Sequence, residues 1–64
     1  MPTLYVEGPR IADLDKKREL VKGMTDAAVK AYGLPAEAMV VLIRENPPEN
    51  VGLGGQLLVD RQKR

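Results

Sequence analysis

The sequence has no cysteine and no histidine among its 64 residues. Disulfides, iron–sulfur clusters and the common zinc sites are therefore excluded. The serine–histidine–aspartate and cysteine–histidine arrangements of nucleophilic catalysis are excluded as well. Carboxylates, lysines, tyrosines and a chain-terminal amine are the groups that remain for acid–base chemistry.

Strong charge and long apolar runs are also missing. Ten basic and nine acidic residues leave a net charge of +1, too little to attract nucleic acid or an anionic membrane. No apolar run reaches the roughly 18 residues of a membrane span, and no signal-peptide core follows the first residues. We expect a cytoplasmic protein with no nucleic-acid or membrane partner. The basic clusters at 16–18 and 61–64 lack interleaved aromatics and have acidic neighbours, so we interpret them as solvated surface.

The chain is short enough to limit its own core. Residues 1–64 predict a single domain, and a chain of this size buries only about 60% of its unfolded surface. Small domains usually compensate with a disulfide, a metal or a partner subunit. Because the first two are excluded, we predict an obligate oligomer with an apolar interface.

The first half of the chain predicts a strand and a helix. Residues 2–7 alternate, with Pro2, Leu4 and Val6 on one face, which is typical of a half-buried strand. After the Gly8-Pro9 break, Arg10 lies in a loop and Asp13 is a good helix N-cap. The helix should end near Tyr32, where Gly33 and then Pro35 follow. Its predicted buried stripe is Leu14, Leu20, Val21, Met24, Ala27, Ala28 and Ala31, and its predicted solvent face is Lys16, Lys17, Lys22, Asp26 and Lys30. Gly23 interrupts the helix, which suggests a close backbone approach.

The second half predicts a strand and a hairpin. Residues 39–43 are apolar on both faces, which indicates a strand covered on both sides. Strand, helix and strand form a βαβ unit with parallel strands and a right-handed crossover. Residues 51–56 predict a small hairpin with its turn at the glycines. The fold class is therefore α+β: a small βαβ subunit plus a C-terminal hairpin, with sheets joined across subunits. The apolar residues 57–59 are assigned to a subunit contact.

The glycine-rich run 52–55 invites comparison with a phosphate-binding loop. Such a loop requires a helix N-terminus immediately after it, or the lysine and hydroxyl residue of a P-loop. The sequence shows neither feature after residue 55. We therefore interpret these glycines as the turn of the hairpin.

Pro2 is the residue with the most unusual chemical possibility. Inside a peptide its nitrogen is an amide that carries no proton, but removal of Met1 converts it into a secondary amine. An α-amino group titrates at about 7.7–8.0, and an apolar pocket or a neighbouring cation lowers that value toward working pH. Pro2 would then serve as a general base. On position alone, the simpler interpretation is that Pro2 begins an edge strand.

The order of these features resembles the 4-oxalocrotonate tautomerase family. The chain shares Met-Pro at the start, a strand, an arginine in the following loop, a β-branched second strand and a Gly-x-Gly-Gly hairpin. The resemblance covers nearly the whole length, and its most specific parts are Pro2 and residues 51–56. It implies a hexamer built from dimers, with no cofactor and no metal, acting on a small carboxylate substrate. It also implies Pro2 as the catalytic base, Arg10 as the carboxylate-binding residue and Val51 in the pocket wall.

Two positions depart from the family pattern. Val40 stands where the family has a second substrate arginine, and Val51 stands where it has an aromatic residue. Arg44 lies on the same face as Val40 but about 13 Å further along the strand, too far to replace it. We therefore expect weak activity on a muconate-type diacid, or a substrate with a single carboxylate.

Two alternatives remain open. In the first, the ammonium form of Pro2 on the same scaffold would act as an acid in hydration or dehalogenation of a small unsaturated acid. In the second, the chain is a non-catalytic oligomeric module in which Pro2 only begins a strand. Retention of Met1 in native protein would favour the second alternative.

Overall fold

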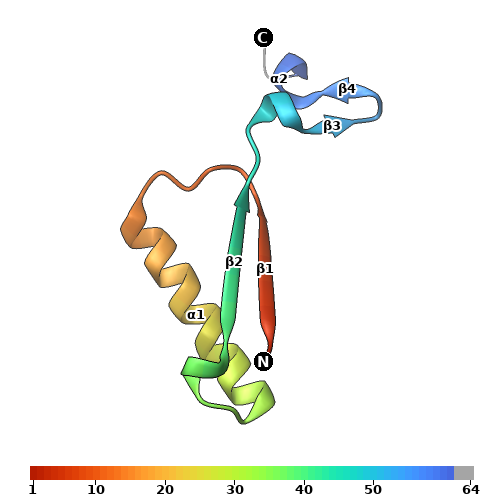
Figure 1. Cartoon of the computed structure of the whole chain (residues 1–64). Helices are drawn as coiled ribbons and strands as arrows, with labels where there is room; N and C mark the ends of the chain where they lie inside the picture. Colours follow the sequence, from red (N-terminus) through yellow and green to blue (C-terminus); the bar gives the residue numbers. More distant parts are fainter. Residues whose placement is uncertain (62–64) are drawn as a thin grey trace.

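The computed structural model describes residues 1–61 (Figure 1). Gln62, Lys63 and Arg64 of the predicted basic cluster lie outside the described residues. The elements are β1 (Thr3–Gly8), α1 (Leu14–Tyr32), a 3₁₀ turn (Ala36–Ala38), β2 (Val40–Glu45), a second 3₁₀ turn (Pro48–Asn50), β3 (Gly52–Leu53), β4 (Gln56–Leu57) and α2 (Leu58–Arg61). The α+β prediction of a βαβ unit followed by a hairpin is confirmed.

Strands β1 and β2 are parallel, as predicted, and α1 is the crossover between them. Their register pairs Thr3 with Val40 and Gly8 with Glu45. The strand begins at Thr3, one residue later than predicted, although the Pro2 carbonyl still accepts a hydrogen bond of 3.0 Å from the Val40 N–H. Pro2 is therefore tied to the sheet through its carbonyl alone, since its nitrogen has no proton to donate.

Both predicted ends of α1 are confirmed. The Asp13 carboxylate accepts from the Asp15 N–H at 2.8 Å and the Lys16 N–H at 3.4 Å, which satisfies two of the helix's first free donors. At the other end, Gly33 takes the left-handed conformation with φ 68°, and its N–H donates to the Val29 carbonyl. A side chain is disfavoured in that conformation, which explains why glycine ends the helix.

The predicted buried stripe of α1 is only partly covered. Of residues 1–61, Ala28 alone is fully buried. Leu14, Ala27 and Ala31 are exposed, and Lys17 is half-buried rather than solvated. The physical reason is width: two strands about 4.8 Å apart are narrower than the roughly 10 Å diameter of a helix. One subunit's sheet therefore cannot cover the whole apolar face of its helix.

The sheet face away from α1 is uncovered in the single chain. Tyr5 and Leu42 are 60% and 43% exposed on this face, and the Arg44 guanidinium lies over the Tyr5 ring, 5.3 Å from its centroid. The prediction that β2 is covered on both sides is thus wrong for the chain alone. Within residues 1–61, no atom outside the adjoining turns of the same helix would lie within 4 Å of a Cβ at Gly23, so no other element makes a close approach there.

The predicted hairpin is confirmed and is followed by a helical turn that the pattern did not predict. Strands β3 and β4 are antiparallel, and the turn residues Gly54 and Gly55 have φ 59° and 83°. The chain then forms the four-residue helix α2, with the Leu58 N–H donating to the Val51 carbonyl at 2.7 Å. That contact closes the segment into a small unit of its own.

The molecule is elongated, measuring 46 × 25 × 13 Å. Its radius of gyration is 15.4 Å, whereas a compact chain of this length would have about 11 Å. Figure 1 shows the cause: residues 46–61, here called the arm, extend beyond the end of the βαβ body formed by residues 1–45. Within residues 1–61, none of the helices combines the length and apolar character needed to cross a membrane.

Candidate active site

Pro2 lies half-buried at the amino-terminal end of β1. Its nitrogen is part of the peptide bond to Met1, so it becomes a basic amine only if Met1 is removed. Met1 is 88% exposed, and its removal would therefore cost the chain little packing. The fold places no covering segment over the Met1 side chain, which leaves the bond before Pro2 accessible.

Arg10 lies at the opposite end of β1, in the loop that leads to α1. Its side chain is exposed and makes no ion pair with any carboxylate of residues 1–61. A guanidinium in this state keeps its planar set of donors available for a carboxylate ligand. Arg10 therefore has the chemical character that the sequence analysis required, although not the proximity to Pro2.

The loop around Arg10 is held by Glu45, a residue that the sequence analysis did not select. One carboxylate oxygen of Glu45, Oε2, accepts from the Ile11 N–H at 2.9 Å and from the Lys17 ammonium at 2.8 Å. The hydrogen bond from Lys17, then that from Ile11, keeps the pKa of the Glu45 carboxyl below its ordinary value, against the opposing effect of partial burial. The only feature of the sequence that could have pointed to Glu45 is its position as an acidic residue at the end of an apolar strand.

Val51 lines a cavity between the body and the arm. This cavity has a volume of about 380 Å³ and is bounded by Glu7, Gly8, Pro9, Asn46, Pro48, Val51 and Leu58. The Asn46 side chain donates to Glu7 across it at 3.2 Å. Val51 is half-buried, and with Leu58 and the prolines it gives the cavity apolar walls.

The three predicted site residues are not brought together within one chain. Arg10 and Val51 lie near the carboxyl end of β1, and Pro2 lies at its start. Six strand residues separate the two ends, which at about 3.3 Å per residue amounts to roughly 20 Å. A small substrate cannot span that distance.

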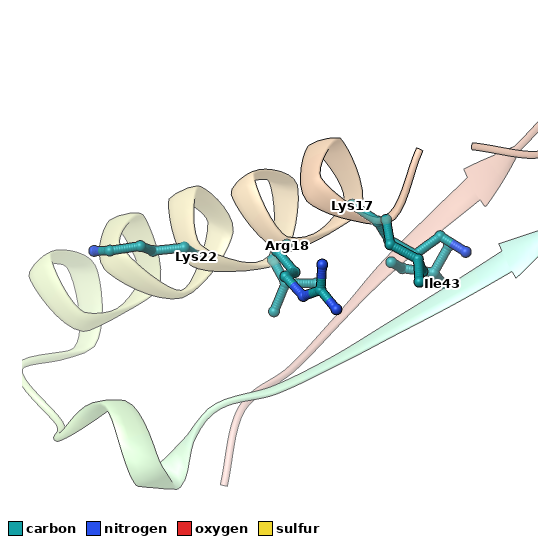
Figure 2. Close-up of a pocket in the computed structure, with 6 residues that line it drawn as sticks. Lys17, Arg18, Lys22 and Ile43 are labelled. Atoms are coloured by element: carbon teal, nitrogen blue, oxygen red, sulfur yellow. The ribbon is translucent and has the colours of Figure 1, made fainter. Parts of the chain in front are cut away.

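A second groove lies between α1 and β2, and Figure 2 labels four of the residues that line it. Its volume is about 390 Å³, and it is lined by Leu14, Lys17, Arg18, Val21, Lys22 and Ile43. Each of its three cations is already paired with a carboxylate: Lys17 with Glu45, Arg18 with Asp15 and Lys22 with Asp26. The groove therefore offers apolar surface but no free cation for an anionic substrate.

The strand positions near Pro2 carry no positive charge. Val40 lies next to Thr3 in the sheet register. Arg44 lies four residues further along β2 and is occupied with the Tyr5 ring. The expectation that Arg44 does not replace a cation at position 40 agrees with this geometry.

Comparison with known protein families identifies the family of this chain. The tautomerase enzyme family matches residues 2–61, nearly the whole chain and beginning at Pro2 itself. The chain belongs to the tautomerase family. No protein with a curated description matches it.

Solved structures with the tautomerase fold agree with the assignment. A protein called DmpI from Archaeoglobus fulgidus is 47% identical over 92% of this chain and 100% of its own, with a TM-score of 0.81. TomN, a 4-oxalocrotonate tautomerase homologue of the tomaymycin biosynthetic pathway, is 28% identical over 98% of this chain and 97% of its own, with a TM-score of 0.86. A heterohexameric 4-oxalocrotonate tautomerase from Chloroflexus aurantiacus is 25% identical over the full length of both chains, with a TM-score of 0.81.

Proposed function

We propose that this tautomerase-family chain is a cofactor-independent keto–enol isomerase of small enol or 2-oxo acids, with Pro2 as its general base once Met1 is removed. The observation that carries the proposal is that the family match begins at Pro2, the residue that directly follows the exposed Met1. The reaction relocates one proton and changes no oxidation state overall, so it needs no redox partner.

The Pro2 amine provides the base in this scheme. In its neutral form the nitrogen takes a proton from the enol hydroxyl or from the carbon next to the carbonyl. It then returns that proton to another atom of the same conjugated system. A base of this kind works best when its pKa lies near the operating pH. Apolar cover around the amine lowers its pKa toward that range.

Arg10 and Val51 provide the rest of the site. The free guanidinium of Arg10 binds the substrate carboxylate through paired hydrogen bonds and stabilises negative charge on the enolate. Val51, on the wall of the cavity at the same end of β1, shields the site from water. Exclusion of water strengthens the interaction between the guanidinium and the carboxylate.

The site is assembled between subunits in this proposal. Because roughly 20 Å separates the two ends of β1, Pro2 of one chain must meet Arg10 and Val51 of another. The uncovered sheet face, the partly covered helix and the extended arm all supply surface for such contacts. A homo-oligomer, a hexamer built from dimers, is the assembly we propose, in keeping with the hexameric relative.

The substrate class follows from the positive charges available. Arg10 has no ion-pair partner within residues 1–61, whereas position 40 holds valine and Arg44 lies four residues further along β2. We therefore propose a substrate with one carboxylate, and weaker activity on a diacid. A diacid would leave its second carboxylate desolvated without a partner, which is costly.

The test compares processed wild-type protein with Pro2→Ala in ketonisation of phenylenolpyruvate. Intact mass must first show that Met1 is absent. In processed protein the Pro2→Ala substitution replaces the rigid secondary amine of proline with a less basic and more mobile primary amine, so kcat should fall, by up to the roughly 10² to 10⁴-fold that positioned acid–base catalysis contributes. Pro35→Ala, which alters an exposed proline after α1, is the matched control and should retain wild-type activity. Equal rates for wild type and Pro2→Ala would refute the proposal.

A further inference from the structure

We propose that Glu45 is a positioning residue for Arg10: its carboxylate holds the backbone beside Arg10 and leaves the guanidinium free for the substrate. This inference rests on the proposed function, because it assigns Arg10 the carboxylate-binding role. Nothing in the local sequence around Arg10 points to Glu45, which is 34 residues away from Ile11 along the chain.

The geometry restrains the backbone on both sides of Arg10. Before it, the Gly8 carbonyl accepts from the Asn46 N–H at 2.8 Å. After it, the Ile11 N–H donates to Glu45 Oε2 at 2.9 Å. Only Pro9 and Arg10 lie between these two anchors, and the ring of Pro9 fixes its own φ. The backbone of Arg10 is thus restrained on both sides, while its side chain is exposed.

The charge on Glu45 is taken up by Lys17 rather than by Arg10. The Lys17 ammonium lies 2.8 Å from Oε2, and the two side chains are 27% and 26% exposed. A partly buried carboxylate beside an arginine would ordinarily capture it, since the bidentate pairing of these groups is strong. With Lys17 in place, Glu45 has a cation already. Arg10 therefore makes no ion pair within the described chain.

Three substitutions separate the contribution of the hydrogen bond from that of the charge. Glu45→Ala removes the acceptor for the Ile11 N–H, and we expect KM to rise roughly tenfold, the factor that accompanies loss of a hydrogen bond to a charged group. Glu45→Gln keeps an acceptor oxygen and should restore KM most of the way to wild type. Glu45→Asp is one methylene shorter and should lie between them, so it serves as the second test if Glu45→Ala does not fold.

A double-mutant cycle with Arg10→Ala tests the assignment directly. If Glu45 acts by placing Arg10, Glu45→Ala should add almost nothing to KM once Arg10 is gone. Additive effects of the two substitutions would overturn the proposal, because they would show that Glu45 acts independently of Arg10. Asp26→Ala is the matched control: it removes a carboxylate from the exposed Lys22–Asp26 pair of α1, and KM should not change.

A direct binding measurement distinguishes failure of this inference from failure of the proposed function. Binding of phenylpyruvate, followed through the Arg10 Nε signal by NMR, should weaken in Glu45→Ala by the same factor as KM. If Pro2→Ala keeps full activity, the proposed function fails. The role of Glu45 is then decided by phenylpyruvate binding to the variants of the Glu45→Ala and Arg10→Ala double-mutant cycle. If Pro2→Ala is inactive but phenylpyruvate binds Glu45→Ala as tightly as wild type, only the present inference fails.

Discussion

The two ends of strand β1 have opposite characters. At its start, Pro2 is held by one backbone hydrogen bond, with the exposed Met1 before it and no cation on the neighbouring strand position. At its other end, Arg10 lies in the loop that follows β1, and Glu45 of β2 accepts hydrogen bonds from the Ile11 N–H of that loop and from Lys17 on α1, while Asn46 donates to Glu7. In the proposed function, the first end supplies the proton-transferring amine once Met1 is removed, and the other end supplies a guanidinium held among charged neighbours.

Under the proposed function, this separation means that one chain does not hold a complete site. A base needs an apolar surrounding that favours its neutral form, whereas a carboxylate-binding guanidinium needs a polar frame that fixes it without neutralising it. Placing the two functions at opposite ends of a strand keeps these environments apart. In the proposed assembly, association of subunits brings them within reach of one small substrate.

The largest expected effect comes from mixing two inactive variants. Pro2→Ala and Arg10→Ala, refolded together in equal amounts, should recover substantial activity, because about a quarter of sites in a randomly mixed oligomer combine an intact Pro2 with an intact Arg10 from another chain. Each variant refolded alone should remain poorly active. If both residues served from the same chain, mixing would recover nothing, and the proposed division of the site between subunits would be wrong.

The next effect comes from charging the uncovered sheet face. Leu42→Asp places a carboxylate at a position that is 43% exposed in the single chain but is proposed to be buried in the assembly. We expect a shift to smaller species in light scattering, together with loss of activity, because an unpaired charge is costly to bury. Leu34→Asp, at a loop position that is 40% exposed, is the matched control. An unchanged oligomer for Leu42→Asp would show that this face is not an interface.

A smaller effect concerns the loss of stability at acid pH, which depends on Glu45 near the carboxyl end of β1. The hydrogen bonds from Lys17 and Ile11 hold the folded pKa of Glu45 below its ordinary value, so its contribution to the free energy of unfolding is complete above that ordinary value and is lost as pH falls through the folded pKa. Lys17 on α1, the Ile11 N–H and Arg10 in the loop are the groups that favour the ionised form.

Thermal unfolding scans from pH 6 to pH 3 should therefore show a steeper loss of stability for wild type than for Glu45→Gln. Glu49→Gln, in the arm, serves as the control for loss of one carboxylate and should follow the wild-type profile. Parallel profiles for wild type and Glu45→Gln would contradict the pKa direction.

The smallest effects come from the ends and the surface of α1. Asp13→Ala removes the two hydrogen bonds of the N-cap and should lower the free energy of unfolding by about 1 kcal/mol. Asp26→Ala removes only an exposed ion pair with Lys22 and should change it by less than about 0.5 kcal/mol. Urea unfolding of the two variants, measured at fixed subunit concentration, checks the order. The reverse order would show that the exposed pair belongs to a contact outside the single chain.

Local patterns correctly predicted the elements but not their burial. The alternation of residues 2–7, the cap at Asp13 and the glycines at 33, 54 and 55 each predicted a feature that the structure contains. The stripe of α1 was predicted as buried, yet Leu14 is 59% exposed. Periodicity reports which face is apolar, and it does not report how wide the covering sheet is.

The residues of the candidate site were likewise only partly predictable from the sequence. Pro2, Arg10 and Val51 were selected from position and resemblance, and their roles remain proposals. Glu45 was not selected, because its partners are Ile11 and Lys17, 34 and 28 residues away in sequence. A contact of that kind depends on how strand register and helix position coincide, and no short-range pattern encodes it.

The sequence by itself determined the order of strand, helix, strand and hairpin, because caps, glycine turns and hydrophobic periods act over a few residues. It also determined which catalytic groups are absent, through the lack of cysteine and histidine. The tertiary structure decided that Pro2 and Arg10 lie at opposite ends of β1, that Glu45 holds the loop, and that most apolar surface is uncovered in one chain. These features depend on register, sheet width and distance in space, which are properties of packed elements rather than of neighbouring residues.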